Sequence, residues 1–143
     1  MTSYVGVPLI LLGMVLCMGW RSAAAYLVGV LATLLSTSGI KRVTNRERPR
    51  VEHLGPRQVS IRGMETNKSF PSGDSAQACL FFGFVAAHTG NPWICFGLPA
   101  VMFARVYFGF HFIADTVFGA WVGFLILVSI ALPAQLLLVA LPT

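Results

Sequence analysis

An arginine, a histidine and an aspartate interrupt an otherwise apolar stretch, as Arg105, His111 and Asp115. Charged groups at membrane depth are costly and are usually functional. Asp115 lies four residues after His111, so the two side chains would share one face of a helix. The carboxylate could then accept the Nδ1 proton of the imidazole and leave Nε2 as a nucleophile. Arg105 could hold an anion beside that nucleophile.

Two further polar segments have the residue types of a phosphate site. The first carries Lys41 and, later in the same segment, Arg48. With Arg105, these cations could surround the nonbridging oxygens of a phosphate ester. The second segment opens a helix with Ser72 and Gly73, where free backbone N–H groups and the helix dipole favour an anion. The three segments together predict a site for a phosphate group.

The reaction that these residues suit is hydrolysis through a covalent intermediate. His111 would attack phosphorus in line, Asp115 would orient the imidazole and stabilise its cation, and water would then hydrolyse the phosphohistidine. Because cationic side chains supply the charge stabilisation, no metal and no other cofactor is expected. The three cysteines form no CxxC or Cys/His cluster of the kind that binds zinc.

The composition predicts a membrane protein. Only 10% of the 143 residues are charged, against roughly 25% in soluble domains, and the mean hydropathy is +0.76. Eight of the ten Lys and Arg residues lie between Lys41 and Lys68, with apolar segments on both sides. Phosphate groups of lipids are therefore better partners for this basic block than nucleic acid.

The apolar pattern predicts an all-α, polytopic integral-membrane bundle, with residues 1–143 as a single membrane domain of about five transmembrane helices. An interfacial turn is expected at Gly19–Ser22, and Pro133 is expected to kink or end the last helix. Alternation through the bilayer would bring the three polar segments to one membrane surface. The expected helices are about Tyr4–Gly19, Ala23–Ile40, Pro71–His88, Trp93–Tyr107 and His111–Ala131.

Three short motifs occur in order between residues 41 and 115. They read Lys-x6-Arg-Pro from Lys41, Pro-Ser-Gly-Asp from Pro71, and Ala-Arg-x5-His-x3-Asp from Ala104. This set resembles the type 2 phosphatidic acid phosphatase family, relatives of the vanadium haloperoxidases. The family's second motif ends in His where this chain has Asp74, and its third begins with Ser where this chain has Ala104. The usual family core has six membrane helices, against the five expected here.

The resemblance implies a role for each matching residue. It assigns His111 as the nucleophile and Asp115 as its orienting partner, and it places Asp74 at the position of the general acid. A carboxylate there would repel a phosphate, and nearby cations would favour its charged form. The phosphate-binding residues that the resemblance implies are Lys41, Arg48, Ser72, Gly73 and Arg105.

Three functions remain open from the sequence. The first is a metal-independent lipid phosphate or polyprenyl diphosphate phosphatase, since a diphosphate has a good leaving group and needs less help from an acid at Asp74. The second is a catalytically degenerate member that serves as a lipid-binding or structural subunit of a larger membrane complex, which Asp74 and Ala104 favour. The third is a lipid phosphotransferase that uses an acceptor alcohol in place of water.

Simpler interpretations exist for several of these residues. His111 could be an interior histidine, Asp115 could pair with Arg105 within the bundle, and Asp74 could be an acid stabilised in the first turn of its helix. Arg42, Arg46 and Arg50 are expected to form a basic surface patch with no substrate role. The positive-inside rule favours the cytoplasmic or matrix-like face for the site, whereas family members commonly face the lumen or periplasm. The membrane and any other membrane subunits stay open.

Overall fold

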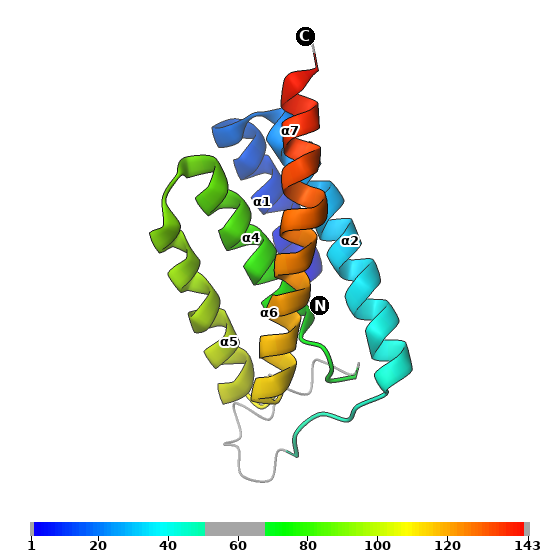
Figure 1. The fold of residues 1–143 in the computed structure, drawn as a ribbon. Coiled ribbons are helices and arrows are strands. Elements are labelled where there is room, and N and C mark those ends of the chain that lie inside the picture. The colour runs from blue at the N-terminus through cyan, green and yellow to red at the C-terminus, as the bar shows by residue number, and fades with distance from the viewer. Residues whose placement is uncertain (1, 51–67, 142–143) are drawn as a thin grey trace.

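The computed structural model describes residues 2–50 and 68–141, with side chains from residue 6 onward. These residues form an all-α bundle of five helical rods and include no strand (Figure 1). The fourth rod begins as a 3₁₀ helix, and the fifth contains a π-helical turn. In chain order the elements are α1 Thr2–Met18, α2 Trp20–Thr44, α4 Gly73–Thr89, η1 Pro92–Phe96, α5 Gly97–Tyr107, α6 Ile113–Ile126, η2 Leu127–Ala131 and α7 Leu132–Ala140.

Helix α2 faces the bundle with a stripe of mostly small residues at helical spacing. Ala25, Gly29, Thr33 and Thr37 repeat every four residues along this stripe, and the two threonine hydroxyls each donate a hydrogen bond to a backbone carbonyl of their own helix, at 2.8 Å. Tyr26 fills the space between this stripe and α4, with its ring 5.6 Å from that of Phe84. The stripe therefore forms the wall against which α4 and the last rod pack.

Helices α4 and α6 approach each other unusually closely, because α6 presents Gly119 and Gly123 one turn apart to the backbone of α4. A Cβ atom at Gly119 would overlap the carbonyl oxygen of Ser72, and one at Gly123 would overlap that of Ala76. Small residues at this spacing let helix backbones pack closely in membrane proteins. The contact fixes the start of α4 against the start of α6, where the polar residues lie.

Replacing Gly119 by alanine is expected to destabilise the protein by about 1–3 kcal/mol, the usual cost of overpacking a tight contact. The methyl group has to push Ser72 away, so the thermal unfolding midpoint in detergent should fall. Gly39→Ala is the matched control, because a Cβ at Gly39 meets nothing within 4 Å. That change should leave the midpoint unchanged or raise it slightly. Equal midpoints for the two variants would contradict the close contact.

Two expected helix boundaries were wrong. Only Gly19 interrupts the chain between α1 and α2, with φ +84°, and Trp20 already belongs to α2. Pro133 neither ends the last helix nor leaves a separate stub, because the chain is helical from Ile113 to Ala140. The π-helical turn η2 lies just before the proline, and the N–H of Leu132 bonds back to the carbonyl of Leu127. This wider turn accommodates the missing N–H and the ring.

The polar segments converge on one end of the bundle, as the alternation of helices predicted. The last turns of α2 and α5 and the first turns of α4 and α6 lie at the lower end in Figure 1. Two of the rods, Trp20–Thr44 and Ile113–Ala140, are long and apolar enough to cross a membrane by length and composition. Two shorter apolar helices cover Gly6–Met18 and Pro92–Tyr107.

Candidate functional site

A tight turn between α5 and α6 brings Arg105 and His111 together. The N–H groups of Phe110 and His111 both donate to the carbonyl of Arg105, at 3.0 and 3.2 Å, and Gly109 takes the left-handed conformation with φ +67°. This is the kind of hydrogen-bonded turn that closes a helix C-terminus. The guanidinium of Arg105 lies over the Phe110 ring, 3.9 Å from its centroid. The five residues between Arg105 and His111 thus correspond to the end of α5 and the turn that follows it.

His111 is buried among cations, with 2% of the residue exposed. Burial lowers the pKa of its imidazole most, followed by the positive charges of Arg48, Arg105 and Lys41. A backbone hydrogen bond with Ser69 raises the pKa and only partly offsets these effects, so that the pKa is about 2. The imidazole is therefore neutral near pH 7, which is the protonation state that a nucleophile needs. The three cations expected to hold a phosphate thus all act on the pKa of this one side chain.

Two of these cations are held by the backbone of other segments. Lys41, in the last turns of α2, donates to the carbonyl of Lys68 at 2.9 Å. Arg48 donates from Nη1 to the carbonyl of Phe110 at 2.6 Å, next to His111 in the chain. The first bond ties the end of α2 to the segment before α4, and the second ties the segment after α2 to the segment before α6. The positive charge of the site is thus contributed by three separate parts of the chain.

Asp115 is fully buried and accepts three hydrogen bonds. Its Oδ1 accepts from Nη1 of Arg46 at 2.9 Å, and its Oδ2 accepts from the hydroxyl of Ser69 and from the N–H of Phe112 at 3.0 Å. The last bond caps the start of α6. Nδ1 of His111 lies 3.8 Å from Oδ2, which is beyond hydrogen-bonding distance, and this nitrogen has no hydrogen-bond partner among the described residues.

Asp74 pairs with Arg105 across the site, with 2.8 Å between Oδ2 and Nη2. The alternative in which Arg105 pairs with Asp115 is therefore wrong, since Arg46 takes that place. The side chain of Asp74 is 27% exposed and lies in the first turn of α4. The carboxylate at the position of the general acid thus contacts one of the expected phosphate ligands.

The start of α4 is held by Ser72 and abuts α6. Ser72 is buried and caps the helix, its hydroxyl accepting from the N–H of Ser75 at 3.3 Å, while its own N–H donates to the carbonyl of Asp115 at 3.0 Å. Gly73 is the first residue of α4. In residues 2–50 and 68–141, no three His, Cys, Asp or Glu side chains come together as metal ligands.

A family model described as the PAP2 superfamily matches residues 22–135. The chain belongs to the PAP2 superfamily. This membership confirms the resemblance drawn from the three motifs, supports a phosphatase-type function, and supports a membrane association that agrees with the two long apolar helices. No curated protein and no solved structure matched the chain.

Two residues of the candidate site were not predicted from the sequence. Arg46 was expected in a surface patch, but it bonds to the buried carboxylate of Asp115 and covers the Phe112 ring, 4.5 Å from its centroid. Ser69 is buried and holds the same carboxylate through its hydroxyl. No spacing rule relates these residues to Asp115, because the contact joins segments that lie far apart in the sequence. The available signal in the sequence was that a buried Asp115 carboxylate would need hydrogen-bond donors from elsewhere in the chain.

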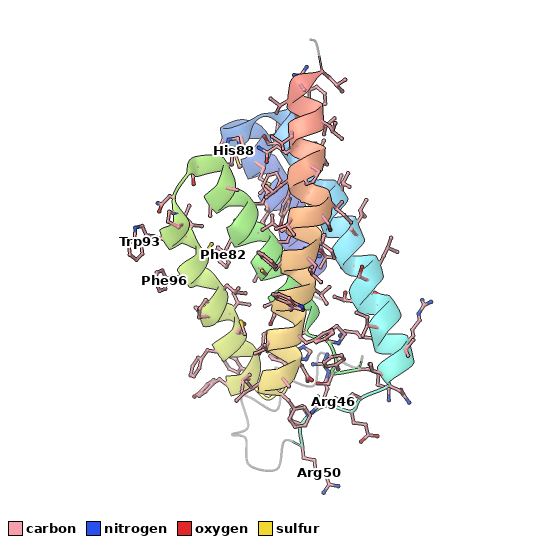
Figure 2. The ribbon with its side chains drawn as sticks, viewed as in Figure 1. Arg46, Arg50, Phe82, His88, Trp93 and Phe96 are labelled. Atoms are coloured by element: carbon pink, nitrogen blue, oxygen red, sulfur yellow. The ribbon has the colours of Figure 1, made fainter. Side chains whose placement is uncertain are left out.

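Replacing Arg46 by alanine is expected to lower kcat by about ten-fold or more and to change KM less, because Arg46 bonds to Asp115 and is not among the residues expected to bind phosphate. Arg46→Lys should restore part of the loss. The control is Arg50→Ala, which removes an equal charge from the same segment at an exposed side chain that points away from the bundle (Figure 2). A rise in KM with an unchanged kcat in Arg46→Ala would instead make Arg46 a ligand of the substrate.

Proposed function

We propose that this PAP2 protein is a multi-pass membrane phosphatase that hydrolyses lipid phosphates or polyprenyl diphosphates through a phosphohistidine. The observation that carries the proposal is the neutral, buried imidazole of His111 with the charges of Lys41, Arg48 and Arg105 around it. A neutral nucleophile inside a cationic cluster suits attack on an anionic phosphorus centre. The five apolar rods would each cross the bilayer, with the site at one surface.

In the first step, Nε2 of His111 forms a bond to phosphorus while the bond from phosphorus to the leaving oxygen breaks. The cations neutralise the nonbridging oxygens, and the N–H groups at the start of α4 add to this stabilisation. The imidazole becomes cationic, and Asp115 accepts a hydrogen bond from Nδ1 once the 3.8 Å separation shortens. Catalytic hydrogen bonds are often long before the substrate binds.

In the second step, water attacks the phosphohistidine in line. The new bond joins the water oxygen to phosphorus, the bond between phosphorus and Nε2 breaks, and inorganic phosphate leaves with the neutral imidazole restored. The proton of the attacking water passes to the carboxylate of Asp74 or to solvent. Because the cationic side chains stabilise the charge throughout, the reaction as proposed uses no metal.

The ion pair between Asp74 and Arg105 favours a second function on the same fold. A carboxylate 2.8 Å from a phosphate-binding guanidinium competes with the substrate for that cation. In this alternative the protein has lost catalysis and serves as a lipid-binding or structural subunit of a membrane complex. The alternative keeps the cation cluster and differs from the first proposal only in turnover.

The test is phosphate release by the purified protein in the presence of a chelator. Phosphatidic acid and a polyprenyl diphosphate are supplied in mixed micelles, and inorganic phosphate is measured with time. The proposed enzyme releases phosphate from at least one substrate, and faster from the diphosphate because its leaving group needs less protonation. Lack of release from either substrate, with retained binding of phosphatidic acid, would establish the non-catalytic alternative.

A further inference from the structure

A groove of about 310 Å³ runs up the face of α4 from the position of the general acid. It begins at Asp74 and Gln77 and continues past Phe81 and Phe82, with α1 on one side and Val101 of α5 on the other. Apart from the polar groups at its mouth, the groove is lined by aliphatic and aromatic side chains. Its volume lies at the lower end of the range for small-molecule sites, about 300–1,000 Å³, and it suits one chain rather than a bulky head group.

The groove exists because α1 packs against α2 rather than against α4. Gly6 of α1 lies on its wall, and a Cβ atom there would meet nothing within 4 Å. Tyr26 forms part of the groove, and its ring contacts that of Phe81 edge-on at 6.2 Å. The space between α1 and α4 is thus bordered by aromatic side chains and left open by Gly6.

The groove is linked to the cation cluster through Asp74. Asp74 lines it, and the same carboxylate lies 2.8 Å from Nη2 of Arg105. From Asp74 to Phe82 the helix rises about 12 Å. One leaflet of the hydrocarbon core is about 15 Å deep. A chain that began at the cation cluster would therefore follow the groove from the level of the head groups toward the middle of the bilayer.

We propose that this groove binds the hydrocarbon chain of the lipid substrate's leaving group. The inference rests on the proposed function. In-line attack by His111 places the leaving oxygen on the far side of phosphorus, beside the position of the general acid, and Asp74 occupies that position at the mouth of the groove. The chain attached to that oxygen then continues along α4 between α1 and α5.

A second hollow provides the competing location. It has a volume of about 830 Å³ and is lined by Leu98 of α5 and by Phe118 and Trp121 of α6, with other apolar residues. Although it is larger, none of the residues that line it is charged, and none is a candidate ligand of phosphate. Bulk lipid can cover such a surface without any link to the reaction. The two hollows share no lining residue. A reactive label in the hydrocarbon chain of the lipid would therefore show which hollow the lipid occupies.

The experiment uses phosphatidic acid with a photoreactive diazirine in one acyl chain. The whole 143-residue protein is reconstituted with this lipid in phosphatidylcholine vesicles. After irradiation, the labelled residues are identified by mass spectrometry, with and without excess unlabelled phosphatidic acid. The expected labels fall on Phe81, Phe82 and Val101, and unlabelled lipid removes them. Competed labels on Phe118 and Trp121 instead, or groove labels that unlabelled lipid does not reduce, would overturn the proposal.

A substitution in α1 gives an independent measurement. Gly6→Phe fills the groove, and we expect it to reduce competed labelling there and to lower the ratio of kcat/KM for long-chain to short-chain phosphatidic acid by at least about ten-fold, or about 1.4 kcal/mol. Gly13→Phe is the matched control, because Gly13 lies on the same helix, also has nothing within 4 Å of its Cβ, and does not line the groove. Equal ratios in the two variants would count against the groove.

The two measurements separate an error in the groove proposal from an error in the proposed function. Phosphate release with competed labels in the second hollow keeps the phosphatase and removes the groove as its chain site. Competed labels in the groove without phosphate release keep the groove as a lipid site and favour the non-catalytic alternative.

Discussion

The His111→Ala variant is expected to release phosphate at least about 10³-fold more slowly than the wild type, because it removes the atom that forms the covalent bond to phosphorus. The imidazole is buried and already neutral, which is the charge state that attack on phosphorus requires. Loss of the ring leaves the cations in place. Lipid phosphate should therefore still bind, and the change should appear in kcat more than in the affinity for an unreactive phosphonate analogue.

The control for this variant is His88→Ala. His88 is an exposed histidine at the opposite end of α4, where its ring lies 3.0 Å from the amide of Gln135 (Figure 2). That variant should keep the wild-type rate. A radiolabelled substrate, quenched with alkali, should leave phosphate on the wild-type protein and none on His111→Ala. Wild-type rates in His111→Ala would remove the phosphohistidine mechanism, even though the chain belongs to the PAP2 superfamily.

Convergence of the polar segments was predictable, because it follows from simple geometry. Helices that alternate through a bilayer return every second end to the same surface, and the apolar segments between Lys41 and Asp115 were clear in the sequence. The structure confirms this convergence, with the segment after α2 and the segment before α6 joined through Arg48 and Phe110. The Arg-x5-His spacing was also readable, although its reason is the turn at Gly109.

The partners of individual charges were less predictable. Spacing along a helix predicted that Asp115 bonds to His111, but His111 lies before the start of α6 and its Nδ1 is 3.8 Å from Oδ2, beyond hydrogen-bonding distance. The carboxylate instead accepts from Arg46 and Ser69, which lie outside its own helix. Such contacts depend on how the connecting segments fold, which periodicity does not describe. The expected end of the last helix at Pro133 was wrong for a different reason, since a local π-helical turn compensated for the proline and kept the helix continuous.

The Asp74→His variant is expected to gain activity on a lipid phosphate monoester by about 10²-fold, the usual contribution of a general acid. The alcohol released from a monoester is a poor leaving group, so protonation of its oxygen limits the reaction in the wild type. The phosphate released from a diphosphate needs little protonation. The gain with a polyprenyl diphosphate should therefore be much smaller, and the preference of the wild type for diphosphate should shrink.

The Asp74→Asn variant separates the two effects of this carboxylate. It removes the negative charge beside Arg105, which the wild-type ion pair places 2.8 Å from the guanidinium, and it supplies no acid. A lower KM without a rise in kcat is expected, because the phosphate then meets no competing anion. If Asp74→Asn raised kcat as much as Asp74→His does, repulsion would be the whole effect of the carboxylate. If Asp74→Asn abolished turnover of the monoester, Asp74 itself would be the proton donor. Because all three results leave the cation cluster intact, each would assign Asp74 a different role at one and the same site.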